Sequence, residues 1–187
     1  MTGKNGGGVF VYDYDGTEWG EPIMIVHAPM GNRLGERLSL TADGSRLAVR
    51  YQAHVAVIDV ESKKVVQTVA SSGATVTLSY DGSLVAVSEE SFEAGRGRVL
   101  LYSEGKYGGD WIKVASFAGD NPLDRFGWST SFNALGDRLA ISAPNFDRDG
   151  LVNRGLVRIY KKIDGTWTQM GKDLLGSVDA EQFRIFP

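Results

Sequence analysis

The sequence contains no cysteine, and its only histidines are His27 and His54. Without thiols there is no disulfide framework of the kind that holds small secreted domains together, and a thiolate zinc site cannot be assembled. Proline is scarce, at 5 residues, and the 24 glycines follow no regular period, which excludes a collagen-like chain. The apolar fraction of 42% is that of a folded domain rather than of a disordered segment.

Positive charge and long apolar runs are also missing. The formal net charge is −3, so the chain lacks the concentrated positive field that holds a nucleic-acid backbone, and we expect no nucleic-acid partner. No apolar run approaches the roughly 20 residues that cross a bilayer, so we expect no membrane span. Residues 1–8 lack the apolar segment of a signal peptide. These absences leave the compartment open.

What the sequence does contain is a repeat. Three segments, 36–49, 74–87 and 128–141, each carry an alternating run, a turn glycine and an apolar-Ala-apolar triplet. The turn glycines are Gly44, Gly82 and Gly136. Because glycine supplies the positive φ of a tight turn, each segment predicts a β-hairpin, whose strands we call a and b. The triplets lack polar alternation, which predicts that strand b is covered on both faces.

A second hairpin, with strands c and d, recurs beside the first. Its four copies are 9–19, 54–69, 98–114 and 156–170, and valine, isoleucine, tyrosine and tryptophan dominate them, as is typical of strands. In three copies we expect a tryptophan to open strand d, namely Trp19, Trp111 and Trp167. One more strand is expected at 183–186. The chain order is therefore c-d, then a-b-c-d three times, then a single strand.

Repeated units of four antiparallel strands are typical of a β-propeller. We predict an all-β fold, a β-propeller of four-stranded antiparallel blades, with about three full blades and partial blades at both ends. A β-sandwich would not repeat the a-b turn three times with matching flanks. The expected blade parts are residues 9–26, 36–69, 74–117, 126–170 and 183–186.

The ring is incomplete by this count, because closed propellers have typically 4 to 8 blades. We expect residues 1–187 to form a single propeller region that is a portion of a larger propeller. A strained four-blade ring and a ring completed by two copies, a homodimer, remain as alternatives. In an open arc the flat apolar blade faces and unpaired strand edges favour association with a protein partner or with the remainder of the propeller.

One stretch resembles a known propeller repeat. Residues 124–129 (DRFGWS) followed by 140–144 (AISAP) resemble the Phe-Gly and Gly-Ala-Pro pattern of FG-GAP repeats, as in the integrin α-chain propeller. Ser142 stands where that family usually has glycine. The close likeness covers residues 124–170. The resemblance implies a propeller and by itself transfers no function.

The c-d hairpin of residues 54–69 is similar to a different propeller family. Residues 55–69 resemble a WD40-type blade, with Ile58-Asp59 at the position of the Trp-Asp pair. Both resemblances imply the same architecture, so the fold prediction does not depend on choosing between them. As a repeat pattern, the two together extend over nearly the whole chain.

The strand order also separates two faces of such a propeller. The a-b and c-d turns emerge on one face, and the longer b-c and d-a connections emerge on the other. Long connections on a rigid scaffold are the usual carriers of binding. We therefore predict that this loop-rich face recognises a protein partner. The candidate contacts are the charged loop residues Arg96, Asp124, Arg125 and Arg154.

One b-c connection has the spacing of a cation loop, with oxygen-bearing side chains at alternate positions and a backbone carbonyl between them. The candidate ligands are Asn145, Asp147, Asp149, Leu151 and Asn153. The segment resembles the calcium loops of integrin propellers, although both outer acids are asparagine here and the family's loop lies between strands a and b. Calcium is the one cofactor predicted, with weak binding. A metal-free turn rich in Asx residues is the alternative.

Catalysis is not expected from this sequence. There is no cysteine, and neither histidine lies in a motif that would pair it with a serine nucleophile. We predict a non-enzymatic protein-interaction scaffold. The alternative is a carbohydrate-active or other hydrolytic propeller enzyme with paired acids at the channel mouth, for which Glu89 and Glu90 or Asp120 and Asp124 are the candidates. Against it, the starts of strands a share no polar chemistry.

Overall fold

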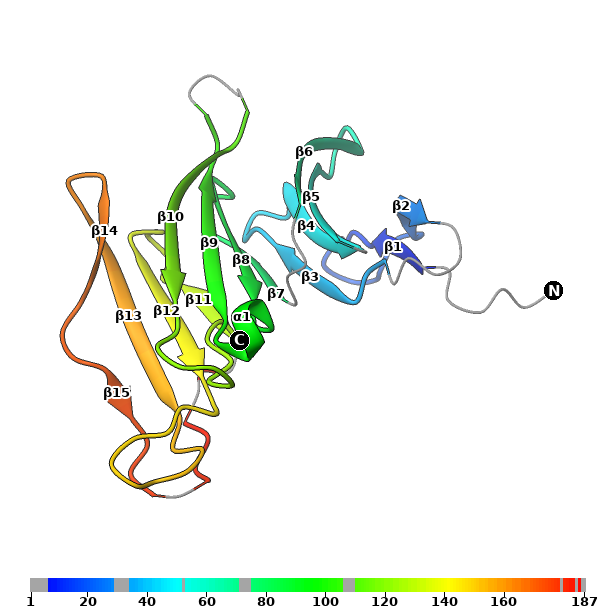
Figure 1. The fold of residues 1–187 in the computed structure, drawn as a ribbon. Helices are drawn as coiled ribbons and strands as arrows, with labels where there is room; N and C mark the ends of the chain where they lie inside the picture. Colours follow the sequence, from blue (N-terminus) through cyan, green and yellow to red (C-terminus); the bar gives the residue numbers. More distant parts are fainter. Residues whose placement is uncertain are drawn as a thin grey trace.

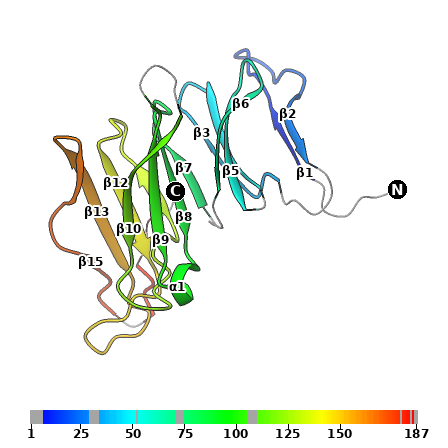
Figure 2. The same cartoon turned by 45° about the horizontal axis from the view of Figure 1, so that its top comes forward.

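The computed structural model describes residues 7–28, 34–51, 53–70, 75–105, 110–178, 180–183 and 185. In this part of the chain, antiparallel sheets follow one another in sequence order and fan out side by side (Figures 1 and 2). Among these residues the only helix is a single turn, α1 (Phe92–Gly95). The prediction of an all-β fold built as a partial propeller is confirmed.

The strands form a leading hairpin and three blades. The hairpin is β1 (Gly7–Val11) and β2 (Ile23–Ala28). Blade 1 is β3 (Arg37–Leu40), β4 (Arg46–Tyr51), β5 (His54–Asp59) and β6 (Lys64–Ala70). Blade 2 is β7 (Thr75–Leu78), β8 (Leu84–Glu89), β9 (Arg98–Ser103) and β10 (Ile112–Ala118). Blade 3 is β11 (Thr130–Phe132), β12 (Arg138–Ala143), β13 (Leu156–Ile163), β14 (Thr166–Gln169) and β15 (Leu174–Leu175).

Each blade is a meander whose strands pair in the order a, b, c, d. The a-b turns use the predicted glycines, and Gly44, Gly82 and Gly136 all have positive φ. In blade 3 strand d is divided, because β14 pairs with one half of β13 and β15 pairs with Leu156 and Val157 at the other half. The a-b-c-d order predicted from the sequence is therefore the order in which the strands pair.

Apolar clusters join each sheet to the next. The cluster between the hairpin and blade 1 contains Val9, Ile25, Leu34, Leu47, Val49, Ala56 and Ile58. The cluster between blades 1 and 2 contains Ala48, Val55, Val57, Val76, Leu78, Val85, Val87 and Trp111. The cluster between blades 2 and 3 includes Leu101, Phe117, Phe126, Leu139, Ile141 and Leu156. Every residue of β8 is buried, because this strand b has a blade on each side. Burial of one such side chain stabilises the fold by roughly 1.5–3 kcal/mol.

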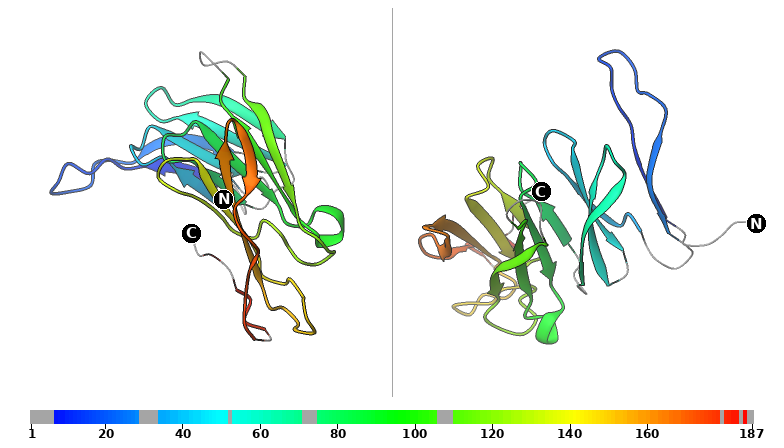
Figure 3. Two further views of the ribbon diagram at one scale, coloured as in Figure 1. Left: turned by 90° about the vertical axis from the view of Figure 1, so that its left-hand side faces the viewer. Right: turned by 90° about the horizontal axis from the view of Figure 1, so that it is seen from above.

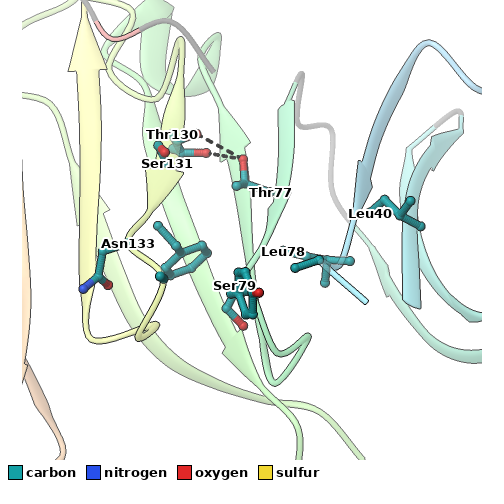
Figure 4. Close-up of a pocket in the computed structure, with 11 residues that line it drawn as sticks. Leu40, Thr77, Leu78, Ser79, Thr130, Ser131 and Asn133 are labelled. Atoms are coloured by element: carbon teal, nitrogen blue, oxygen red, sulfur yellow. Dashed lines mark hydrogen bonds between the residues drawn. The ribbon is translucent and has the colours of Figure 1, made fainter. Parts of the chain in front are cut away.

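Strands a lie side by side at the inner edge of the fan, where side-chain hydroxyls join neighbouring blades (Figures 3 and 4). The Ser39 hydroxyl of β3 accepts a hydrogen bond from the backbone N–H of Leu78 in β7 (2.9 Å). The Thr77 and Thr130 hydroxyls of β7 and β11 lie 2.7 Å apart. These bonds fix the spacing of the blades around the central axis.

The structure corrects one predicted strand position, and another lies partly outside the described residues. In the described part of the chain the last strand is β15, and Phe183 forms an isolated parallel bridge with Gly155; residues 184 and 186 of the strand predicted at 183–186 lie outside that part. Trp19 does not open strand d, because β2 begins at Ile23 and Trp19 pairs with Tyr14 in an isolated bridge. A long connection separates β1 from β2, so the tryptophan is part of that connection.

Candidate partner-binding site

The b-c connections of blades 2 and 3 and the d-a connection between these blades gather at one end of the blades, the lower end in Figure 1. Arg96 follows α1 in the b-c connection of blade 2, and Arg154 lies in the corresponding connection of blade 3. Asp124 and Arg125 lie in the d-a connection between β10 and β11. The fold thus brings all four predicted contact residues to the same end of the molecule.

Two segments at this end have the same backbone structure. The first linker, residues 119–126, follows β10, and the second linker, residues 176–183 without the undescribed residue 179, follows β15. Each is tied to the b-c connection of its own blade by four equivalent N–H to carbonyl hydrogen bonds. In the first linker these run from Gly119 to Gly97, Leu123 to Ala94, Arg125 to Gly95 and Phe126 to Arg96. In the second they run from Gly176 to Gly155, Ala180 to Val152, Gln182 to Asn153 and Phe183 to Arg154.

The two predicted loop arginines hold these linkers in place. The Arg96 Nε donates to the carbonyl of Gly119 at 2.6 Å, and the Arg154 Nε donates to the carbonyl of Gly176. Each guanidinium also pairs with an acid of its own connection, Arg96 with Glu93 (3.0 Å) and Arg154 with Asp149 (2.9 Å). The Arg96 side chain keeps 39% of its surface exposed against 17% for Arg154. Arg96 is therefore the more accessible of the two.

Arg125 is a second accessible cation of this end. Its guanidinium donates to the Glu90 carboxylate at 3.2 Å and lies over the ring of Trp128, with 4.3 Å between the guanidinium carbon and the ring centroid. The side chain is 39% exposed. A guanidinium placed on an aromatic face keeps its remaining donors available to a second group. Arg96 and Arg125 thus present two fixed positive charges at the end of the blades where the b-c and d-a connections lie, which we call the loop end.

Asp124 does not belong to the accessible surface. It is only 3% exposed, and its carboxylate accepts a hydrogen bond from the backbone N–H of Asn121 at 2.8 Å. Burial raises the pKa of Asp124, because it disfavours the charged form. Because Asp124 is buried, the prediction that it contacts a partner is corrected. Its carboxylate instead accepts a hydrogen bond within the first linker.

A buried cation that sequence reasoning missed joins blades 2 and 3. Arg158 of β13 is 9% exposed and donates to Asp173 (2.8 Å) and Asp120 (3.2 Å). The two carboxylates raise the pKa of Arg158, since they stabilise its charged form. The signal was present in the sequence, as a charge within the apolar first half of strand c, Leu156–Tyr160.

The acid pairs that the enzyme alternative requires are engaged elsewhere. Glu89 pairs with Arg98, Glu90 pairs with Arg125, and Asp120 pairs with Arg158. Each of these three carboxylates is thus held by a guanidinium. The hollow of about 400 Å³ at the inner ends of strands a, drawn in Figure 4, is lined by uncharged residues such as Leu40, Thr77 and Phe132.

The candidate calcium loop forms a tight turn. Arg148 and Leu151 exchange backbone hydrogen bonds (3.2 and 3.0 Å) around Asp149 and Gly150, which both have positive φ. Asp149 pairs with Arg154, and Asp147 accepts from the N–H of Asn153 at 2.6 Å. Among the described residues no three His, Cys, Asp or Glu side chains group closely enough to hold a metal ion. This donor set fits the metal-free turn better than a calcium site.

Calcium binding by Asn145, Asp147, Asp149, Leu151 and Asn153 stays a prediction, which calorimetry on the chain and on Asp147→Ala would test.

The described residues include no helix long and apolar enough to cross a membrane. Outside the loop end, the other charged turn residues, such as Asp43 and Asp81, cap their own a-b turns.

Comparison with solved structures gives the same architecture at low sequence identity. The chain is similar to a proposed 6-phosphogluconolactonase from Bacteroides uniformis, with a TM-score of 0.60, 13% identity, and coverage of 92% of this chain and 49% of that one. It is similar to the Cps50 (Swd1) β-propeller domain of Myceliophteria thermophila, with a TM-score of 0.59, 14% identity and coverage of 90% and 53%. The WD40 domain of Toxoplasma gondii coronin gives a TM-score of 0.55, 14% identity and coverage of 78% and 36%.

These likenesses show a propeller-repeat fold and nothing finer. The chain spans about half, or less, of the length of these structures. No protein-family model matches the sequence, and no curated protein matches it.

Proposed function

We propose that the chain is a non-enzymatic protein-interaction scaffold that recognises a protein partner through its b-c and d-a connections. The observation that carries this proposal is the pair of partly exposed guanidinium groups of Arg96 in the b-c connection of blade 2 and Arg125 in the first linker, two segments that four backbone hydrogen bonds join. Preorganised cations lose little conformational freedom when they meet an acidic group of a partner. WD40 propellers among the similar structures support a scaffold role in general terms.

The test compares charge reversal at the two ends of the blades. The double variant Arg96→Glu with Arg125→Glu is expected to lose the proteins that the unchanged chain retains in affinity purification. The matched control is Lys64→Glu with Arg138→Glu, which makes the same change in net charge at exposed sites away from the loop end. The control should retain the same proteins. Equal losses from both variants would remove the loop end as the recognition surface.

The repeat itself we assign to the FG-GAP type, on the geometry of Phe126-Gly127. Phe126 is completely buried between blades 2 and 3, and Gly127 has φ of +89°. A Cβ at Gly127 would lie 3.0 Å from Val99 and 3.1 Å from the carbonyl oxygen of Arg98, so this tight contact and the positive φ together favour glycine. A buried phenylalanine and a closely approached glycine are the two features expected of a Phe-Gly pair. The remainder of a larger propeller and a second copy, as a homodimer, are the further partners that this fold allows.

A further inference from the structure

The edge of β1 that faces away from β2 has no partner strand among the described residues, whereas the corresponding edges in the three blades are paired. In the three blades, every strand c lies between strand b and strand d: β5 between β4 and β6, β9 between β8 and β10, and β13 between β12 and β14. In the described part of the chain, β1 pairs only with β2. Within the described residues, the N–H and carbonyl groups of its other edge have no strand partner, and such an edge is a template for one more strand.

The structure identifies β1 as a strand c by a position that recurs at its start. A Cβ at Gly7 would lie 2.2 Å from the carbonyl oxygen of Leu34. In the same way a Cβ at Gly97 would lie 2.1 Å from the carbonyl oxygen of Phe126. Gly155 meets the backbone of Phe183 at 2.1 Å. Three of the four strands c, β1, β9 and β13, thus have a glycine at or just before their start over which the next linker closes, whereas β5 begins at His54 without one.

The sequence after these glycines repeats as well. It reads GGVFVY from Gly7, GRVLLY from Gly97 and GLVRIY from Gly155, with valine third and tyrosine sixth. The fourth position is Phe10 in β1, Leu100 in β9 and Arg158 in β13. Leu100 and Arg158 are 7% and 9% exposed, whereas Phe10 is 48% exposed. The face of β1 that a preceding blade would cover is therefore exposed at Phe10, on the same strand whose edge opposite β2 has no partner among the described residues.

We propose that β1 accepts a β-hairpin of the a-b type of this same repeat, which completes the leading hairpin into a fourth blade. The incoming strand b pairs antiparallel with β1. The two best-matched blades set the register, because Ser88 pairs with Val99 and Ser142 pairs with Val157. The residue of the incoming strand that corresponds to Ser88 and Ser142 then lies opposite Val9.

The occupant comes from outside these 187 residues. All three a-b hairpins of the chain already pair with the strand c of their own blade. A second copy could supply one only by giving up a pairing of its own. This inference rests on the strand pairing and not on the loop end, so it stands or falls separately from the proposed function.

The sharpest test uses the chain's own repeat. Because Gly7 occupies the position of Gly155, residues 128–154 can be placed directly before Gly7, in place of residues 1–6, to supply strands a and b in sequence. We expect the β1 amides that do not bond to β2 to exchange with solvent at least about 100-fold more slowly than in the unextended chain. The matched control carries Pro in place of the copied Ile141, which removes a ladder hydrogen bond and prevents pairing. Equal exchange in the extension and its control overturns the proposal.

Two further arms use the unaltered chain. A peptide of residues 128–143 added in excess is expected to slow exchange of the same amides, and a peptide with the same proline substitution is not. If the peptide alone has no effect, the extended chain decides. Sedimentation tests the competing occupant: a monomer agrees with an outside source, whereas a dimer with protected β1 amides shows exchange between copies and overturns it.

Discussion

The two linkers have the same local structure in different surroundings. Both run from a glycine to a phenylalanine, and both make the same four hydrogen bonds to their own blade. Phe126 at the end of the first is 0% exposed, because blade 3 covers it, whereas Phe183 at the end of the second is 36% exposed. The comparison separates two causes: the blade that a linker leaves determines its path, and the blade that follows determines its burial.

The acid two residues before each phenylalanine shows the same division. Asp124 in the first linker is 3% exposed, and Glu181 in the second is exposed. Both carboxylates accept hydrogen bonds from backbone N–H groups near the start of their linker, Asp124 from Asn121 and Glu181 from Val178. The role of the acid is thus local, while its electrostatic environment is set by the neighbouring blade.

The largest difference is expected on truncation of the two phenylalanines. Phe126→Ala should lower the free energy of unfolding by about 3–5 kcal/mol, because it leaves a cavity in the cluster between blades 2 and 3. Phe183→Ala should cost less than about 1 kcal/mol, since solvent already reaches this ring. Urea unfolding of the two variants measures both. Similar losses would mean that Phe183 is as well packed as Phe126, against the comparison.

The glycines beneath the linkers should give the next largest effect. Gly97→Ala places a Cβ within 2.1 Å of the Phe126 carbonyl oxygen at φ of +81°, so the buried linker must move. We expect a loss of about 3 kcal/mol. Gly155→Ala meets Phe183 equally closely at φ of +83°, but the second linker can shift into solvent, so the loss should be smaller.

Gly150→Ala is the matched control for backbone strain alone. Its φ is +79° and its Cβ would meet no atom within 4 Å, so it should cost only about 1 kcal/mol. Denaturant unfolding of the three variants therefore orders them as Gly97, Gly155 and Gly150. If Gly150→Ala were as costly as Gly97→Ala, positive φ and not the closed linker would explain all three.

Local periodicity was enough to predict the blades. Turn glycines, alternating strands and apolar triplets report contacts within one hairpin, and the strands b and c that they mark are the buried ones. Strand d of blade 3 was harder, since β15 is only two residues long and pairs with β13 across an interruption. Phe183 was assigned to a new strand because its apolar neighbours resemble one, whereas its backbone belongs to a linker.

The sequence was enough to predict where the loop end lies, but not what each of its charged residues does. Strand order alone puts Arg96, Arg125 and Arg154 at one end. That Asp124 is buried, or that Arg158 bridges two blades, depends on the packing of connections distant in sequence. Strands a were judged by their first residues, and the shared hydroxyls of Ser39 and Thr77 lie two residues further along. An alignment on the turn glycines would have revealed them.

The smallest effect is a difference in the titration of the two linker acids. Burial raises the pKa of Asp124 above its ordinary 3.8, whereas hydrogen bonds from the backbone N–H groups of Ser177 and Val178 lower the pKa of Glu181 below its ordinary 4.5. Side-chain carbonyl chemical shifts measured by NMR between pH 2 and pH 7 report both values. We expect Asp124 to titrate above 3.8 and Glu181 to titrate below 4.5.

The sign of each contribution to stability follows from these shifts. Glu181 stabilises the folded state above pH 4.5, and this contribution disappears as the pH falls through its lowered pKa. Asp124 favours the folded state when protonated, below pH 3.8, and this contribution is lost as the pH rises through its raised pKa. In Asp124→Asn the second effect should vanish while the Glu181 titration stays unchanged. If Asp124 titrated below 3.8 in the unchanged chain, burial would not be disfavouring its charged form. The two linker acids would then not differ in electrostatic environment in the way argued above.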